Sequence, residues 1–160
     1  MSSAADVSDV RLTPGESSDL DAVMDVMASA FDPSFGEGWT RSQCAGILPL
    51  SGVALVLARD DDGAVHGFSL LRTVADEAEL LLLAVAPRAQ RRGVGGALLN
   101  HFIELGRARG VRRLHLEVRD GNSAVAMYQS FGFKAEGRRP KYYCGQDGSQ
   151  HDALTMAREL

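Results

Sequence analysis

The stretch ELLLLAVAPRAQRRGVGGALL, residues 79–99, changes from an apolar run into a turn of glycines and arginines, and then into a second apolar run. Residues 78–85 are almost continuously apolar, which is typical of a central strand buried on both faces. Pro87 ends this strand, and the apolar spacing beyond the glycines predicts a helix over residues 95–109, capped by Gly110. Residues 112–118 alternate as a second strand does. The unit is therefore a right-handed crossover between two parallel strands.

The glycine turn can be compared with three phosphate-binding motifs. A P-loop needs Lys-Ser/Thr after its last glycine, and this turn has none. A dinucleotide fingerprint needs a glycine where Leu98 stands, and the chain holds only one crossover unit, although Glu117 imitates the acidic residue of that motif. Residues 90–95, QRRGVG, match the third pattern, Gln/Arg-x-x-Gly-x-Gly/Ala, between a strand and a helix.

Such a turn leaves backbone N–H groups and the positive end of a helix dipole open to an anionic pyrophosphate. Arg91 and Arg92 add positive charge, and Arg88 is a further candidate. The alternative interpretation is a solvated basic turn that binds nothing.

The rest of the chain supplies strands and helices around this unit. Residues 1–10 are small and polar, so we expect a mobile start. Apolar residues at helical spacing predict a helix over residues 17–31, with Ser18 as its cap and an acidic face of Asp19, Asp21 and Asp25. A short helix follows at 40–48, and the turn DDDG at 60–63 joins strands 53–59 and 64–74 as a hairpin.

A last helix is predicted over residues 123–131, with Asn122 or Ser123 as its cap. Two final strands, 133–139 and 153–160, enclose a loop at 140–152. The element order gives an α/β fold in one domain, residues 1–160, with a mixed sheet flanked by helices on both faces.

Composition excludes several classes of protein. The 160 residues carry a net charge of −4, which argues against binding a nucleic-acid backbone and suits a basic partner. No apolar run is long enough to cross a membrane, and the first residues do not form a signal peptide, so we expect a cytoplasmic protein. Cys44 and Cys144 are far apart, and no Cys/His cluster has zinc-ligand spacing, so no metal is expected.

The glycine turn in this context resembles that of the GNAT superfamily of acetyl-CoA-dependent N-acetyltransferases. Three segments, ELLLLAVAPRAQRRGVGGALL, LHLEVRDGNSAVAMYQSFGF and RRPKYYCGQDGSQHDALTM, are similar to the RimI-type ribosomal-protein alanine N-acetyltransferases, over about residues 77–156. The resemblance implies the GNAT fold and acetyl-CoA as co-substrate, with the pantetheine along the central strand and the Val85 amide polarising the thioester carbonyl. The residues implied in carrier binding are Leu83, Ala84, Val85, Arg91, Arg92, Gly93, Val94, Gly95, Gly96 and Asn122.

Acetyl transfer to an amine needs a group that takes the proton, and Glu117 is the candidate base. On strand 112–118 it shares one face with Arg113 and His115, whereas the apolar residues share the other. RimI-type enzymes carry their acidic base in this Leu-Glu-Val-Arg position. The alternative is a salt bridge from Glu117 to Arg113 or Arg119, and His115 is either a proton relay or merely a neighbour.

The resemblance makes Tyr128 the acid that protonates the leaving thiolate; the alternative is a buried core aromatic. Asn122 and Tyr128 are one residue closer together than in the usual pattern, which puts the contact of Asn122 with the carrier in question. Tyr142 and Tyr143 match the aromatic pair that flanks an acceptor peptide. Leu82 replaces a common asparagine, and His151-Asp152-Ala153 replaces Glu-Asp-Ala.

The predicted activity is acetyl transfer to the N-terminal α-amine of a protein, with the N-terminal alanine of a basic ribosomal protein as the implied acceptor. The acidic residues Asp19, Asp21, Asp25, Asp32 and Glu37 are expected to attract such a peptide. A small-molecule amine acetyltransferase is the alternative within this class. A catalytically silent acetyl-CoA-binding module is the alternative from another class.

Overall fold

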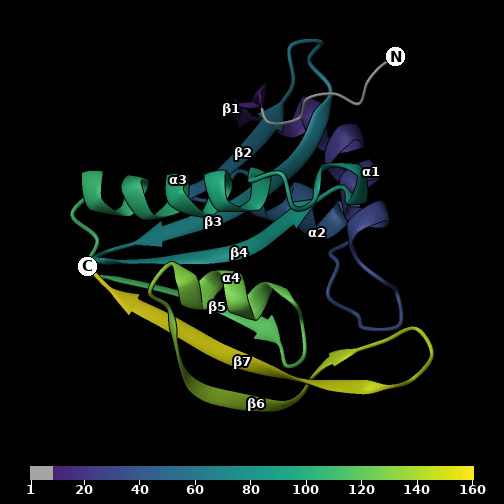
Figure 1. Ribbon diagram of the computed structural model, residues 1–160, viewed down its shortest axis with the longest axis vertical. Coiled ribbons are helices and arrows are strands. Elements are labelled where there is room, and N and C mark those ends of the chain that lie inside the picture. The colour runs from purple at the N-terminus through teal and green to yellow at the C-terminus, as the bar shows by residue number, and fades with distance from the viewer. Residues whose placement is uncertain (1–8) are drawn as a thin grey trace.

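The computed structural model describes residues 9–160, which form one mixed sheet with helices on both faces (Figure 1). The seven strands lie in the order β1-β2-β3-β4-β5-β7-β6, and all neighbours are antiparallel except β4 and β5. The strands are β1 (Arg11–Gly15), β2 (Val53–Arg59), β3 (Val65–Val74), β4 (Glu77–Val85), β5 (Arg113–Arg119), β6 (Lys134–Cys144) and β7 (Gln150–Glu159).

Four helices bury two apolar clusters against opposite faces of the sheet. Helices α1 (Leu20–Ala30) and α2 (Arg41–Ile47) cover one face, on Leu57, Phe68 and Leu70. Helices α3 (Val94–Ala108) and α4 (Ala124–Ser130) cover the other (Figure 1). This arrangement confirms the predicted α/β class, the parallel crossover through α3 and the hairpin of β2 and β3.

The N-terminal region differs from the prediction. Residues 1–8 of the expected mobile start lie outside the described residues, and Arg11–Gly15 form an edge strand paired with β2 that the sequence did not suggest. Ser18 does not cap α1, because a 3-10 turn over Ser17–Asp19 precedes the helix. Glu16 and Asp19 form a capping box there, with the Glu16 amide 2.9 Å from Asp19 Oδ2.

The predicted loop at 140–152 is mostly strand. β6 runs to Cys144 and β7 begins at Gln150, with Tyr143 opposite His151 and only residues 145–149 left as a turn. A bulge between Arg139 and Tyr143 interrupts the pairing, and Lys141 has a φ of 55° in it. The Asp152 carboxylate accepts the Lys141 amide at 2.9 Å, so a side chain completes the pairing that the bulge breaks.

Strands β4 and β5 separate half-way along their length. They pair only between Glu77–Leu80 and Arg113–Leu116, after which β5 is paired by β7 alone. Leu80 and Leu82 pair with consecutive residues of β3, so Leu81 is the extra residue of a β-bulge at the same point. A bulge bends its strand and increases the local twist, which accounts for the divergence of β4 from β5.

The divergence leaves backbone groups of β4 facing the gap. The Ala86 amide donates to the His66 carbonyl of β3 at 2.8 Å. Because consecutive residues of a strand turn their backbone groups to opposite sides, those of Val85 and Leu83 point away from β3. They face the space that β5 has left.

The loop between α1 and α2 packs directly on the turn between β6 and β7. The Gln146 amide donates to the Pro33 carbonyl and the Ser149 hydroxyl to the Ser34 carbonyl, each at 3.0 Å. Gly36 has a φ of 71°, and a β-carbon there would overlap the carbonyl oxygen of Cys144. The close approach of the two segments therefore requires glycine at this position.

Gly36→Ala is expected to destabilise the protein more than Gly63→Ala. Both glycines have positive φ, so each alanine adds about 1–2 kcal/mol of backbone strain. Only at Gly36 does the new methyl also meet backbone, whereas nothing lies within 4 Å at Gly63. The overlap adds a further loss of about 1–3 kcal/mol. Urea unfolding measures both variants, and equal losses would refute the packing of the loop on the turn.

Candidate active site

A cleft of about 540 Å³ occupies the gap between β4 and β5. It collects most of the residues that the sequence singled out, from elements on both sides of the sheet. Those that line it are Leu83, Ala84, Val85, Arg91, Glu117, Asn122, Tyr128, Tyr142 and Tyr143. The predicted carrier-binding residues that do not line the cleft are Arg92, Gly93, Val94, Gly95 and Gly96.

The glycine turn stands at one end of this cleft. Gly93 has a φ of 84° and takes the N-cap position of α3, so its conformation favours glycine. The α-carbons of Gly95 and Gly96 face α4 instead, since added β-carbons would lie 3.3 Å from Met127 Sδ and 3.5 Å from Phe131 Cζ. These two glycines therefore let α3 pack closely on α4. The first-turn N–H groups of α3 have no acceptor within the helix.

Two side chains beside this turn have different partners. Gln90 Nε2 donates to the Val85 carbonyl at 3.0 Å and ties the turn to the end of β4. Arg88 points away from the turn, because it donates to His66 Nδ1 and to the Val65 carbonyl, each at 3.2 Å. The expectation that Arg88 adds charge to the turn is therefore wrong.

Glu117 lies where the alternation of β5 places it, on the face opposite the buried leucines. Its carboxylate accepts from Arg139 Nε at 2.9 Å and from Thr155 Oγ1 at 2.7 Å, and its side chain is 14% exposed. The predicted alternative named the wrong partners, because Arg113 pairs with Glu136 and Glu159 and Arg119 pairs with Glu37. Arg139 is 61% exposed, so this ion pair is open to solvent.

His115 shares the face of β5 that carries Glu117. Its Nε2 lies 3.7 Å from Glu77 Oε1, and it does not line the cleft. This position favours the interpretation of a neighbour over that of a relay.

Tyr128 is both a buried core aromatic and a residue of the cleft. Its ring belongs to the apolar cluster under α3 and packs edge-on to Phe133 with centroids 6.2 Å apart, yet the residue also lines the cleft. Burial, and then the charge of Glu37, raise the pKa of Tyr128 well above its usual value. The same two causes raise the pKa of Tyr143. Both phenols therefore remain protonated at neutral pH.

Asn122 is occupied by contacts within the protein. Its Oδ1 accepts the Ala124 amide at 2.8 Å, while Ser123 makes no capping bond, so Asn122 caps α4. Its Nδ2 donates to Glu37 Oε2 at 2.7 Å. The sequence gave no sign of this second contact.

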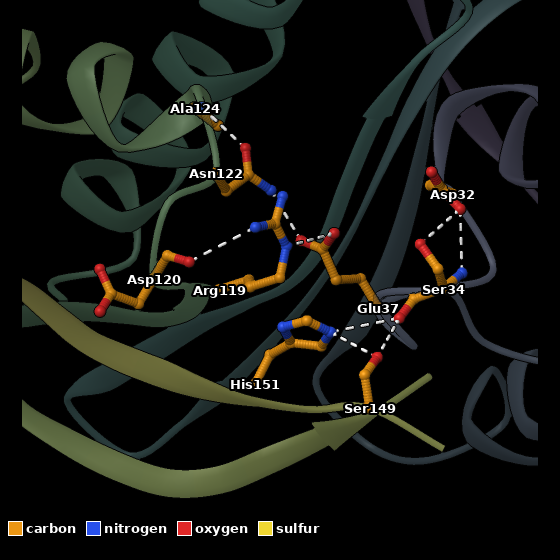
Figure 2. A network of polar contacts seen from close by, with 9 residues as sticks. All are labelled: Asp32, Ser34, Glu37, Arg119, Asp120, Asn122, Ala124, Ser149 and His151. Carbon is orange, nitrogen blue, oxygen red and sulfur yellow. Dashed lines mark hydrogen bonds and ion pairs between the residues drawn. The ribbon is translucent and has the colours of Figure 1, made fainter. Parts of the chain in front are cut away.

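Glu37 is the centre of a polar network that the sequence analysis missed (Figure 2). Its carboxylate is 9% exposed and accepts from Arg119 Nε at 3.0 Å as well as from Asn122. The Arg119 guanidinium also lies 3.7 Å over the ring of Phe35. The aromatic residues that flank Glu37 in FGEGW were the available signal that this loop is packed.

The expected acidic face is largely neutralised. Asp19 pairs with Arg59, Asp21 with Arg41 and Glu37 with Arg119, so these three do not form an open acidic surface. Two other carboxylates line the cleft. Asp32 accepts from the amide and hydroxyl of Ser34, which lowers its pKa, and Glu79 has no ion-pair or hydrogen-bond partner in the described part of the chain.

Comparison with known proteins agrees with this geometry. The sequence profile described as the acetyltransferase (GNAT) family matches residues 20–133, which include the glycine turn, Glu117 and Tyr128. The chain belongs to the acetyltransferase (GNAT) family. The matched residues include β4 and β5, the two strands that border the cleft.

Relatives within the GNAT family have more specific names. A ribosomal protein bS18-alanine N-acetyltransferase of Escherichia coli (strain K12) is 44% identical over 97 residues, which are 60% of this chain and 65% of that protein. This chain thus matches slightly less than two thirds of that relative's length. The crystal structure of a ribosomal-protein-S18-alanine N-acetyltransferase from Escherichia coli superposes with a TM-score of 0.84, at 34% identity over 94% of each chain.

A more distant GNAT structure shares the fold alone. It is a phosphinothricin acetyltransferase from Sinorhizobium meliloti in complex with AcCoA, 20% identical, with a TM-score of 0.78 over 95% of this chain and 89% of that one. Within residues 9–160, no helix is long and apolar enough to span a membrane. The same residues contain no cluster of three potential metal ligands.

Proposed function

We propose that this protein is an acetyl-CoA-dependent N-acetyltransferase whose acceptor is the N-terminal α-amine of a basic protein, with the N-terminal alanine of a ribosomal protein as the best candidate. The observation that carries the proposal is the cleft itself. Its walls include Arg91 and the part of β4 that β5 does not pair. They also include Glu117 and Tyr128, together with the carboxylates of Asp32 and Glu79. The names of the E. coli relatives support the choice of acceptor. Such an acceptor places the reaction in the cytoplasm.

The carrier end of the cleft suits a thioester with an anionic tail. Leu83 and Val85 offer backbone groups that β5 does not pair, and an added strand-like chain such as pantetheine satisfies them. Acetyl-CoA supplies the acetyl group as a thioester, and the Val85 N–H polarises the carbonyl of that thioester. Arg91 and the first-turn N–H groups of α3, at Gly93, Val94, Gly95 and Gly96, bind the pyrophosphate, with Arg92 beside them.

Arg91→Ala is expected to weaken acetyl-CoA binding by about 1–2 kcal/mol, the scale of a charge-assisted hydrogen bond. Arg88→Ala is the matched control, because Arg88 is a neighbouring arginine that points to His66 and Val65. Calorimetric titration with acetyl-CoA measures both variants. If Arg91→Ala binds like the control, the carrier site is elsewhere.

Glu117 supplies the proton transfer, and Tyr128 stabilises the leaving thiolate. Glu117 takes the proton of the acceptor ammonium, directly or through one water, while Thr155 and Arg139 hold its two oxygens. Tyr128 donates its hydrogen bond to the sulfur as the thiolate leaves. Its raised pKa keeps the proton on the phenol, because a thiol is a stronger acid with a pKa of about 8.5. Tyr128 therefore acts chiefly as a hydrogen-bond donor to developing charge in a water-poor site.

Glu117→Gln and Tyr128→Phe are each expected to lower turnover by roughly 10²–10⁴, the usual contribution of a positioned acid or base. Acetyl-CoA affinity stays at the wild-type value in both variants. Wild-type kcat/KM rises with pH as the acceptor amine deprotonates, and shows no alkaline decline from Tyr128 below about pH 10, because the pKa of this phenol is raised.

A thiol-release assay from pH 6 to 10 measures these profiles. Full activity of Glu117→Gln over that range would exclude Glu117 as the base. Acetyl-CoA binding without turnover in the wild-type protein, against every amine offered, would favour a silent binding module.

The acceptor end of the cleft favours a basic peptide. Within the described residues Asp32 and Glu79 form no ion pair, in contrast to the carboxylates of Glu37 and Glu117. Tyr142 and Tyr143 also line the cleft, stand edge to face with centroids 4.9 Å apart, and Tyr142 is half exposed. Two carboxylates without an ion pair, in a cleft that aromatic side chains also line, suit a cationic chain.

The enzyme is expected to prefer a terminal α-amine to a lysine side chain. At pH 7 an α-amine is about 10–15% neutral and a lysine only about 0.04%, so a single carboxylate is adequate for the first alone. Initial rates are compared for an Ala-starting, Arg-rich peptide, its N-terminally blocked form carrying a lysine, and free polyamines. Faster acetylation of the blocked peptide or of a polyamine would contradict the α-amine assignment and favour the lysine or small-molecule alternative.

A further inference from the structure

The contacts of Glu37 join three segments that are distant in sequence. Its two carboxylate oxygens accept from Arg119 at the end of β5 and from Asn122 at the start of α4 (Figure 2). Its own loop is held to the turn between β6 and β7, where Ser149 Oγ and His151 Nε2 lie 3.0 and 3.2 Å from the Ser34 carbonyl. The loop that carries Glu37 is therefore held in place, and Glu37 in turn contacts Asn122 at the start of α4.

We propose that Glu37 is a positioning residue for Tyr128, acting through Asn122 and the N-terminus of α4, an inference that rests on the proposed role of Tyr128. Asn122 is then a brace between the acceptor-side loop and α4 rather than a contact of the carrier. Neither residue touches the reacting atoms in this scheme.

The first step of the argument is the orientation of the Asn122 amide. An asparagine side chain has one acceptor and two donors, and only its oxygen can accept the Ala124 amide. Because a carboxylate can only accept, Glu37 Oε2 at 2.7 Å selects the nitrogen of Asn122. That selection leaves Oδ1 facing Ala124, where it makes the capping bond of 2.8 Å.

The second step is the dependence of α4 on this cap. α4 has seven residues, which is too short to be stable without its caps and its packing. Ser123 gives no side-chain cap, so Asn122 supplies that bond to the helix start. Tyr128 lies about one helical turn beyond Ala124, and its hydroxyl position follows the start of the helix.

The third step is the stability of the brace itself. A nearly buried carboxylate persists only where it is paired and hydrogen-bonded, and Arg119 and Asn122 meet both needs of Glu37. Arg119 is in turn fixed by the Phe35 ring at 3.7 Å and by the Asp120 carbonyl at 3.4 Å. The charge of Glu37 also contributes to the raised pKa of Tyr128, which agrees with its proximity to the phenol.

The test is a double-mutant cycle in the full-length protein. Glu37→Gln and Asn122→Ala are each expected to lower kcat about ten- to a hundredfold, with the Kd of acetyl-CoA within twofold of wild type. In a Tyr128→Phe background, either substitution lowers kcat less than about twofold further, because the group that it positions is gone. Glu104→Gln, which loses an ion pair to Arg107 on the exposed side of α3, leaves all values unchanged.

Each outcome decides the inference. If the loss of kcat in Glu37→Gln or Asn122→Ala multiplies fully with the loss in Tyr128→Phe, the inference is overturned. A rise in the acetyl-CoA Kd of Asn122→Ala would also overturn it, and would return Asn122 to the carrier site. Asn122→Ala leaves the Glu37–Arg119 pair in place, so it remains informative if Glu37→Gln fails to fold. If Tyr128→Phe alone keeps full activity, the proposed acid fails and this inference with it. If Tyr128→Phe lowers kcat but the losses of the single variants multiply in the double variants, the proposed role of Tyr128 stands and only the positioning role of Glu37 fails.

Discussion

The separation of β4 from β5 after Leu80 is the constraint on which the site depends. A continuous sheet would pair every backbone group of β4 and leave no space between the strands. The bulge at Leu81 bends β4 away, while β7 continues to pair β5, so the gap opens without leaving β5 an edge strand. The cost is that the backbone N–H and C=O of Leu83 and the N–H of Val85 have no strand partner, because the Val85 carbonyl accepts from Gln90. In the proposed function a ligand with a strand-like edge satisfies them.

The cleft has a different charge at each end, and this difference follows from the elements that line it. The carrier end takes the positive end of the α3 dipole and Arg91. The proposed acceptor end contains the carboxylates of Asp32 and Glu79. The other two carboxylates that line the cleft and are named above, Glu37 and Glu117, are paired with arginines. In the proposed function, an anionic carrier and a cationic acceptor therefore enter opposite ends of the cleft, and each is repelled by the end that binds the other.

The sequence predicted the parts of the fold that depend on local periodicity. The buried strand β4, the amphipathic α3 and the alternation of Leu114, His115, Leu116 and Glu117 on β5 are each readable within one element. β1 and the long β6–β7 pair were missed because their pairing is tertiary. β1 contains Pro14 and Gly15, which are residue types depleted in strands, and β6 contains Pro140 and a bulge. Gly95 and Gly96 were expected to clear space for phosphate, but they face Met127 and Phe131 of a helix that the motif does not contain.

Glu37 shows why the remaining part of the site could not be predicted. Its partners Arg119 and Asn122 lie 82 and 85 residues further along the chain, and the acidic residues Asp19, Asp21 and Asp25 that precede it suggest a solvated carboxylate. Only the folded chain brings the loop, the end of β5 and the start of α4 to one point. Once a carboxylate is buried there, removing Arg119 leaves an uncompensated charge, at a typical cost of about 3–5 kcal/mol. The proposed positioning role follows from this coupling, because one carboxylate links the loop between α1 and α2 to the start of the helix that carries Tyr128.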